Sequence, residues 1–247
     1  AVGGGYSNSV SGSFTTIAGG HQNAAAGYFS AVGGGRENII VGVGSYTFVG
    51  GGLRNTANES YVVVGGGFRN AASAAYATVG GGTDNLASGT HAVVGGGELN
   101  TNAATRGVIA GGAGNVGTGA YSAVGGGFDN TAGGVYAVVA GGREHTAGGY
   151  FSAIGGGSLN VVGGQGAYTV ISGGVHNSAN ESFAAIGGGR RNTVTAWHAT
   201  VGGGADNTAT GTYAVVGGGE FNTNAATRGV VSGGRGNLAM AAYSSVG

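Results

Sequence analysis

A valine or isoleucine that precedes a run of small residues, mostly glycine, recurs along the whole chain at nearly constant spacing. Fourteen of the sixteen steps between these aliphatic anchors are 15 residues long, and the other two are 17. Biased composition alone would not keep an aliphatic residue in phase over so many steps, so the chain is a tandem repeat. The anchors are Val2, Ile17, Val32, Val49, Val64, Val79, Val94, Ile109, Val124, Val139, Ile154, Ile171, Ile186, Val201, Val216, Val231 and Val246.

A longer repeat is superimposed on the short one. The two long steps, at 32–49 and 154–171, lie 122 residues apart. The stretch "VVGGGELNTNAATRGV" from Val93 returns after the same interval, with one change, as "VVGGGEFNTNAATRGV" from Val215. We therefore expect a single repeat array over residues 1–247, in which a super-repeat occupies about 2–123 and again 124–245.

Two positions in the aligned repeats indicate where the chain turns a corner. The second and third residues after an anchor are always glycine, which indicates positive φ or a close backbone approach at a tight corner. The sixth residue is asparagine in fifteen of sixteen repeats, with His145 as the exception. Asparagine tolerates left-handed backbone and can bond to its own turn. Stacked in successive repeats, these side chains can also bond to one another as a ladder.

The repeat predicts an all-β fold. Two corners in 15 residues leave room for two short strands, one through "Y-S-A-V" and one through "N-x-A". Helix is disfavoured, because each interior glycine costs about 1 kcal/mol relative to alanine. Successive turns should stack in parallel and in register, which gives a parallel β-solenoid, or β-roll, of about sixteen 15-residue turns.

Strand alternation predicts two different faces. The anchor and the residue two before it should point into the roll, whereas a mostly aromatic column three before the anchor, together with residues such as Val63 and Val215, should point outward. An outward apolar face of this size exceeds what monomers normally expose, and identical chains side by side are its simplest cover. We expect a homo-oligomer. The alternative is that the aromatic side chains fold over the roll's own edge without association.

Charged residues concentrate just past the glycine run. Fourteen of the eighteen lie four or five positions after an anchor, where they should form one exposed edge. This edge serves either solubility or recognition by variable corners on a constant scaffold. For recognition, an anionic glycan or a carboxylate is the expected ligand. The candidate ligand edge consists of Arg36, Arg54, Arg69, Arg190 and Arg191.

The stretch that occurs twice departs from the repeat at three positions together. Glu98 takes a corner, Asn102 replaces the usual alanine, and Arg106 replaces the aromatic residue. An arginine on a buried face needs a carboxylate or amide partner, so these residues are predicted to form a polar layer that fixes register, with an ion or ligand site as the alternative. The second copy consists of Glu220, Asn224 and Arg228.

Composition and motifs argue against several classes of function. All nine basic residues are arginine, they do not cluster, and the formal net charge is +0, which argues against nucleic acid. No apolar run approaches the roughly 20 residues of a membrane span, so we expect no membrane contact. Carboxylate pairs, metal-ligand spacings and phosphate-loop motifs are not recognisable in the sequence, and we expect neither an enzyme nor a bound metal or cofactor.

The columns "A-V-G-G-G-x-x-N-x-A-x-G" resemble the YadA-like head repeat of trimeric autotransporter adhesins, and glycine-rich repeats of bacterial and phage surface fibres. The resemblance spans the whole chain. It is carried by the anchor column, the glycines that follow, and an alanine–glycine tail such as Ala132 and Gly134. The three consecutive glycines and the nearly constant asparagine differ from the usual sequence pattern of the adhesin repeat. The resemblance implies a left-handed roll, a side-by-side trimer, and a location at the cell surface or on a virion fibre.

The expected function is that of an extracellular structural and adhesive fibre segment, the head or shaft of a trimeric surface adhesin, with a surface glycan or a host or matrix protein as its partner. One alternative is a self-assembling filament subunit with a mechanical role. A second is an ice-binding solenoid, because threonine recurs after asparagine in six turns, although other residues interrupt that column.

Overall fold

The computed structural model describes residues 1–41 and 45–247 and contains no helix among them. The chain divides into two compact units, residues 1–121 (unit 1) and 122–247 (unit 2). Each unit is a parallel β-solenoid, and together they comprise about sixteen turns of about 15 residues. The division lies next to the end of the first super-repeat copy. The predicted fold class is confirmed.

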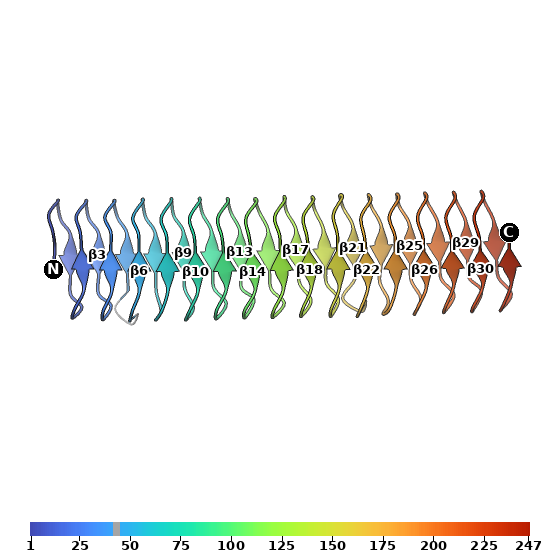
Figure 1. The fold of residues 1–247 in the computed structure, drawn as a ribbon, viewed down its shortest axis with the longest axis horizontal. Helices are drawn as coiled ribbons and strands as arrows, with labels where there is room; N and C mark the ends of the chain where they lie inside the picture. Colours follow the sequence, from blue (N-terminus) through green and yellow to red (C-terminus); the bar gives the residue numbers. More distant parts are fainter. Residues whose placement is uncertain (42–44) are drawn as a thin grey trace. The chain divides into compact units, whose positions relative to one another are not determined.

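In unit 1, two-residue strands alternate between two sheets, and strands of successive turns lie side by side (Figure 1). One sheet contains β1 (Ser9–Val10), β3 (Ala24–Ala25), β5 (Ile39–Ile40), β7 (Thr56–Ala57), β9 (Ala71–Ala72), β11 (Leu86–Ala87), β13 (Thr101–Asn102) and β15 (Val116–Gly117). The other contains β2 (Thr16–Ile17), β4 (Ala31–Val32), β6 (Phe48–Val49), β8 (Val63–Val64), β10 (Thr78–Val79), β12 (Val93–Val94) and β14 (Val108–Ile109).

Unit 2 repeats this arrangement. Its odd-numbered strands are β17 (Thr131–Ala132), β19 (Thr146–Ala147), β21 (Val161–Val162), β23 (Ser178–Ala179), β25 (Thr193–Val194), β27 (Thr208–Ala209), β29 (Thr223–Asn224) and β31 (Leu238–Ala239). Its even-numbered strands are β16 (Ala123–Val124), β18 (Val138–Val139), β20 (Ala153–Ile154), β22 (Val170–Ile171), β24 (Ala185–Ile186), β26 (Thr200–Val201), β28 (Val215–Val216), β30 (Val230–Val231) and β32 (Ser245–Val246).

Equivalent residues of successive turns pair with each other. In unit 1, Val64 pairs with Val79 fifteen residues later. The long turns keep this register, since Val32 pairs with Val49 and Ile154 pairs with Ile171. The longer loop of the step 154–171 lies between β21 and β22. The corresponding loop in unit 1 includes residues 42–44, which lie outside the described residues.

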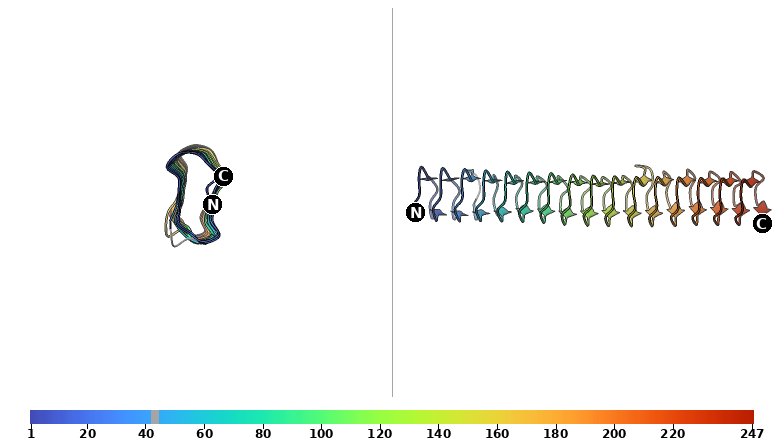
Figure 2. Two further views of the ribbon diagram at one scale, coloured as in Figure 1. Left: turned by 90° about the vertical axis from the view of Figure 1, so that its left-hand side faces the viewer. Right: turned by 90° about the horizontal axis from the view of Figure 1, so that it is seen from above.

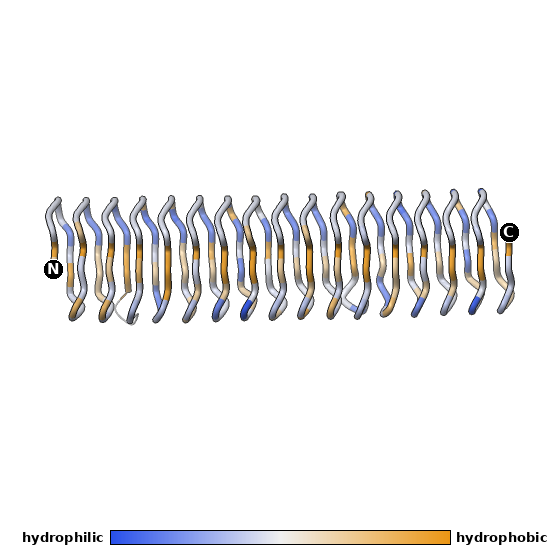
Figure 3. The backbone as a smooth tube through the Cα atoms, in the orientation of Figure 1, coloured by the Kyte–Doolittle hydropathy of each residue, from blue (hydrophilic) through white to orange (hydrophobic). Residues whose placement is uncertain are grey.

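The core of each unit is a thin layer between its two sheets. Figure 2 shows each turn as a flattened loop, with the strands of the two sheets on opposite sides. Val62, Val64 and Ala72 point inward and are fully buried, as are most of their equivalents in other turns, whereas Val2 in the first turn is exposed. In Figure 3 the hydrophobic segments recur at corresponding places in successive turns. The inward alternation predicted for the anchor and the residue two before it is confirmed.

The asparagine column forms a hydrogen-bonded ladder inside the glycine corner, which is the turn between an even-numbered strand and the next odd-numbered one. The N–H of Asn85 donates to Oδ1 of Asn70 at 3.0 Å. Its Nδ2 donates to the carbonyl of Gly81 in its own turn at 2.9 Å and to that of Gly97 in the next turn at 2.8 Å. Asn192 of unit 2 repeats the pattern. The predicted ladder is therefore present, and it also gives the carbonyl of Gly81 a hydrogen-bond donor.

The left-handed residues are not the ones that the sequence indicated. Asn85 is not left-handed, but the residue before it, Asp84, has φ of 55°. At the opposite corner, called here the aromatic corner, Tyr76 has φ of 62° and precedes the strand by two residues. The strands are thus shorter than "Y-S-A-V" and "N-x-A", because a left-handed residue ends the extended backbone in each case.

Glycine is required in the glycine corner for two reasons. Gly82 has φ of 88°, a conformation that other residues rarely adopt. A Cβ atom at Gly82 would lie 2.1 Å from the carbonyl oxygen of Gly97 and 2.7 Å from Nδ2 of Asn85. The close stacking of successive corners therefore excludes any side chain at this position.

We predict that Asn85→Ala lowers the free energy of unfolding by about 3 kcal/mol, because the buried N–H of Asn100 and the part-buried carbonyl of Gly81 lose their hydrogen-bond partner. Urea unfolding followed by circular dichroism measures the change. Thr83→Ala, in the same corner but with a more exposed side chain, serves as the control and should change stability by less than about 0.5 kcal/mol. Equal effects of the two substitutions would contradict a stabilising role for the ladder.

Candidate functional site

The charged residues of the candidate ligand edge lie on the outside of the glycine corner, as predicted. Each position in this corner stacks on the same position of the next turn, so two columns of side chains run along each unit. One column contains Arg36 and Arg190, and the next contains Arg54, Arg69 and Arg191. A charge therefore meets the side chains directly above and below it.

Most of these arginines are paired with carboxylates of neighbouring turns. The carboxylate of Glu37 accepts hydrogen bonds from Nε of Arg36 at 2.7 Å and from Nε of Arg54 at 2.5 Å. Arg69 pairs with Asp84 at 2.5 Å. These pairs are exposed, so each contributes little to stability, but they neutralise the charge that an anionic ligand would require.

Arg191 makes the best-formed pair of unit 2. Its Nε and Nη2 atoms approach the two carboxylate oxygens of Asp206 at 2.7 and 2.8 Å, which is a bidentate arrangement. Arg190 is less engaged, with its nearest carboxylate contact, to Asp206, at 4.0 Å. Of the five candidate arginines, Arg190 is therefore the one whose guanidinium is most available to a ligand.

The pKa values agree with this pairing. The hydrogen bond from Arg54, assisted by Arg36, lowers the pKa of Glu37. The hydrogen bond from Arg191 lowers the pKa of Asp206, and that of Arg191 is raised in return. Both carboxylates therefore stay ionised at neutral pH. Opposite charges at the same column position in successive turns were the sequence signal for these pairs.

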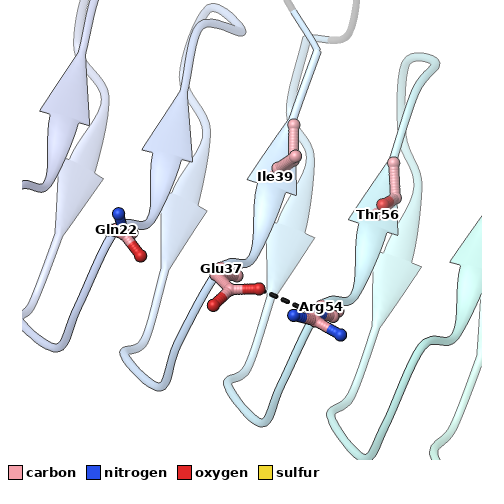
Figure 4. Close-up of a pocket in the computed structure, with 5 residues that line it drawn as sticks. All are labelled: Gln22, Glu37, Ile39, Arg54 and Thr56. Carbon is pink, nitrogen blue, oxygen red and sulfur yellow. Dashed lines mark hydrogen bonds and ion pairs between the residues drawn. The ribbon is translucent and has the colours of Figure 1, made fainter.

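A shallow hollow of about 540 Å³ lies on the outer face of the odd-numbered sheet of unit 1. Gln22, Glu37 and Arg54 line it from the charged column, and Ile39 and Thr56 line it from β5 and β7 (Figure 4). Its polar groups are already joined by the Glu37–Arg54 pair. The hollow offers a mixed polar and apolar contact surface, but its charges largely cancel.

The predicted polar layer of Glu98, Asn102 and Arg106 is not brought together. Among the described residues, no hydrogen bond or ion pair joins these three side chains. Glu98 is exposed in the glycine corner, Asn102 is fully buried, and Arg106 lies on the outside at the aromatic corner. In unit 2, Glu220, Asn224 and Arg228 occupy the same three separate places, and Glu220 instead contacts Arg235 at 3.4 Å.

Both arginines find partners on the surface. Nη1 of Arg106 donates to the hydroxyl of Tyr121 at 2.6 Å, and its guanidinium carbon lies 5.6 Å from the centre of that ring. Arg228 donates to the hydroxyl of Tyr243 at 3.0 Å and lies 5.5 Å from the ring of Tyr213. Because this column faces outward, the arginines need no buried carboxylate or amide.

Asn102 instead belongs to a compensating pair that the sequence interpretation missed. Its Nδ2 donates to the carbonyl of Val93 at 2.9 Å, and its Oδ1 accepts from the N–H of Ala104 at 3.2 Å. A Cβ atom at Gly107 would lie 2.7 Å from this Oδ1 and 2.5 Å from Cβ of Ala104. The larger inward side chain is thus accommodated by a glycine opposite it. The same exchange at Asn224 and Gly229 was the available signal.

His145 replaces asparagine in the ladder of unit 2 and is fully buried. Its Nδ1 accepts from the N–H of Asn160 at 3.1 Å, and its own N–H donates to Oδ1 of Asn130. Within the described residues, Nε2 is buried without a hydrogen bond of good geometry. Burial lowers the pKa of the imidazole, against smaller opposing effects of the Gly157 and Asn160 backbones.

An aromatic ladder runs along the aromatic corner of each unit. In unit 1 the ring centres are 4.5–5.3 Å apart, and in unit 2 they are 4.6–5.3 Å apart, with nearly parallel planes. The faces of the inner rings therefore cover one another, and the edges meet solvent. The ladder consists of Phe14, Phe29, Tyr46, Tyr61, Tyr76 and His91 in unit 1, and Tyr136, Phe151, Tyr168, Phe183, His198 and Tyr213 in unit 2.

The outward residues of the even-numbered strands lie on the same side of the strand as this column. Most of them are valine or alanine, with threonine or serine at Thr16, Thr78, Thr200 and Ser245. Val63, Val108 and Val230 are between 37% and 44% exposed, and Tyr61 is 47% exposed. The predicted outward apolar face is present in each unit.

Comparison with known proteins adds no functional assignment: no protein-family model matches the chain, and no curated protein is significantly similar to it. In the described residues, no group of three or more histidine, cysteine, aspartate or glutamate residues could hold a metal ion. The same residues include no helix suited to crossing a membrane.

We predict that Asn102 and Gly107 are energetically coupled. Gly107→Ala should lower the free energy of unfolding by about 1–3 kcal/mol through overpacking, and Asn102→Ala should do so by leaving backbone groups unpaired. The double variant should lose at least about 0.5 kcal/mol less than the sum of the single losses. Urea unfolding of the four proteins measures this cycle.

The turn with Ala72, Ala74 and Ala77 shows why the double variant should be accommodated, because it has alanine at all three equivalent positions. The same cycle at Asn224 and Gly229 provides a replicate in unit 2. Strictly additive losses at both places would show that the two residues do not compensate for each other.

We predict that His145 makes unit 2 less stable at acidic pH. The unfolded chain binds a proton at about pH 6.5, whereas the folded imidazole resists protonation, so stability is complete above that pH and declines as the pH falls towards the lower folded pKa. His145→Asn should remove this component. Unfolding free energies measured between about pH 7.5 and about pH 5 test the prediction, with the exposed His176→Asn as the control. Parallel pH profiles for the native chain and His145→Asn would contradict it.

Proposed function

We propose that the chain is a structural and adhesive segment of an extracellular fibre and that it works as a homo-oligomer, most simply a trimer. The observation that carries the proposal is the outward face of the even-numbered strands and the aromatic ladder, which is mostly apolar along each unit, with threonine at a few turns such as Thr78 and Thr200. A recurring surface suits contact along a length better than recognition of one small molecule. The resemblance of the repeat to adhesin and fibre repeats supports the same function.

The apolar face supports association between copies. Monomers rarely expose contiguous apolar patches of more than a few hundred Å². In each unit, exposed valines lie beside an exposed aromatic ladder, and association between copies would cover both. Identical chains present identical rows at the same spacing, so a second or third copy matches every turn. The outer face of the odd-numbered sheet is more mixed, because threonine alternates there with residues such as Ile39 and Leu86, and it would remain in contact with solvent.

In this proposal, the side chains of the glycine corner form the surface that binds the adhesion partner. Its side chains vary from turn to turn while the backbone stays constant, which is the arrangement expected of a recognition edge. Paired charges favour a partner that exchanges hydrogen bonds with both members over one that needs free positive charge. Surface glycans or host and matrix proteins fit this description, and Arg190 is the position most open to a carboxylate.

We predict that the native chain has a mass of about three times 23.2 kDa in solution. Val63→Glu with Val108→Glu should reduce it to one chain, because burying several carboxylates in an apolar interface is costly. Multi-angle light scattering after gel filtration measures the mass. Ala71→Glu with Thr101→Glu, on the outer face of the other sheet, is the matched control and should keep the native mass.

A native chain that remains a single 23.2 kDa species would refute the homo-oligomer. Particles that keep growing with concentration would favour a mechanical filament subunit. Adhesion is tested separately with the native oligomer on arrays of acidic and neutral glycans and of matrix proteins. Binding to none of them would leave a structural segment without adhesive function.

Ice binding is a second candidate, favoured by one local feature. Thr193, Thr208 and Thr223 stand in one outward row on adjacent strands of unit 2. Leucine, valine or alanine interrupts the equivalent row elsewhere, as at Leu86 and Leu238. Thermal hysteresis of the native chain distinguishes this function, and its absence would remove the candidate.

A further inference from the structure

Three tyrosines of the aromatic ladder occupy successive turns of unit 1. The ring centres of Tyr46 and Tyr61 are 5.2 Å apart with planes 9° from parallel, and those of Tyr61 and Tyr76 are 4.8 Å apart with planes 3° from parallel. All three are about half exposed. Each phenol is therefore open to solvent while its ring touches the next phenol.

The backbone holds these rings in register. The three residues share a left-handed conformation, with φ of 56°, 60° and 62°. The N–H of Tyr61 donates to the carbonyl of Ser45 at 2.8 Å, and that of Tyr76 donates to Ser60 at 3.1 Å. Rotation of the rings about their Cβ–Cγ bonds is enough to turn an ortho carbon of one ring towards its neighbour, without a change in strand pairing.

We propose that Tyr46, Tyr61 and Tyr76 form an oxidative cross-linking site, at which hydrogen peroxide and a haem peroxidase join neighbouring rings into dityrosine within one chain. Each of two phenols loses one electron and its hydroxyl proton. The two phenoxyl radicals form one bond between their ortho carbons, and the hydrogen on each bonded carbon then moves to the phenol oxygen. Overall, two tyrosines lose two electrons and two protons, and one hydrogen peroxide becomes two waters.

Proximity is the reason for coupling at this site rather than between free chains. A phenoxyl radical on Tyr61 already lies against two other tyrosine rings, so its coupling with a second radical formed on either ring is effectively unimolecular. Each bond would close a loop that spans one turn, which removes conformational freedom from the unfolded chain. Two such bonds would cross-link three successive turns covalently. This inference goes beyond the proposed function and does not require association between copies.

Unit 2 provides a matched site with different chemistry. The equivalent residues, 122 positions later, are Tyr168, Phe183 and His198. Their ring centres are 5.3 and 4.6 Å apart with planes 7° and 5° from parallel, so the geometry is the same. Phenylalanine and histidine have no phenol to oxidise to a phenoxyl radical. Stacking in this run therefore occurs without the means of coupling.

Tyr150 offers a second comparison in unit 2. It meets Tyr136 and Tyr168 at 6.0 and 6.3 Å with planes 84° and 82° apart. These edge-to-face pairs are farther apart than the stacked ones and differ in orientation. Less coupling is expected there than at Tyr61.

The test is oxidation of the native chain with hydrogen peroxide and a haem peroxidase, followed by gel separation of single chains from linked chains. Trypsin then releases Tyr46, Tyr61 and Tyr76 in three separate peptides, 37–54, 55–69 and 70–106. Mass spectrometry of the single-chain band should find 55–69 joined to either of the others, at the sum of the two masses less two hydrogens.

Tyr61→Phe should abolish these linked peptides, because it leaves no two phenols in neighbouring turns of the run. Phe183→Tyr with His198→Tyr should create a link between peptides 144–190 and 192–228 of unit 2. Dityrosine found only in the linked-chain band, only at Tyr150, or unchanged by Tyr61→Phe would overturn the proposal. The absence of any dityrosine from the oxidised native chain would do the same.

Discussion

The hydrogen bonds between the asparagine ladder and the glycine corner are the interaction on which the rest of each unit depends. Each asparagine connects three turns: its amide accepts from the next asparagine and donates to glycine carbonyls of its own turn and the following one, and its backbone N–H donates to the amide of the preceding turn. This network requires a corner without side chains, which explains the glycines, and it requires every turn to lie in register. Register in turn places equivalent residues above one another. The stacked rings, the ion pairs and the mostly apolar outward face all follow from that stacking.

Much of this architecture could be predicted from the sequence because the signal is repeated many times. The anchor column, the glycines and the asparagines determine a parallel solenoid with an inward aliphatic row, and the two long steps identify where extra residues enter. Residue conformation within a corner was less predictable. Asparagine is a common left-handed residue, yet here its side chain occupies the interior and the preceding residue takes the positive φ. Asparagine does not follow its left-handed propensity here, because its side-chain amide is buried at a position where it is fully hydrogen-bonded.

The candidate site was predictable in its position but not in its contacts. The charges lie at one exposed edge, as expected, but pairing between turns depends on which side chains stack in the same column. The departures at Glu98, Asn102 and Arg106 occur together in sequence, which suggested one polar layer. In the structure the three side chains lie in different places: Glu98 at the glycine corner, Asn102 in the core and Arg106 at the aromatic corner. The true compensation, between Asn102 and Gly107, links two inward positions on opposite sides of a thin core and needed the three-dimensional arrangement to be recognised.

The longer turn between β21 and β22 shows how the repeat can accept inserted residues. Two additional residues enter at the aromatic corner, while the flanking strands keep their partners above and below. Added length at this corner does not propagate into either sheet. The corner is therefore a natural acceptor for grafted peptides or inserted binding loops, and a chain of this kind could diversify what it displays without altering how it stacks.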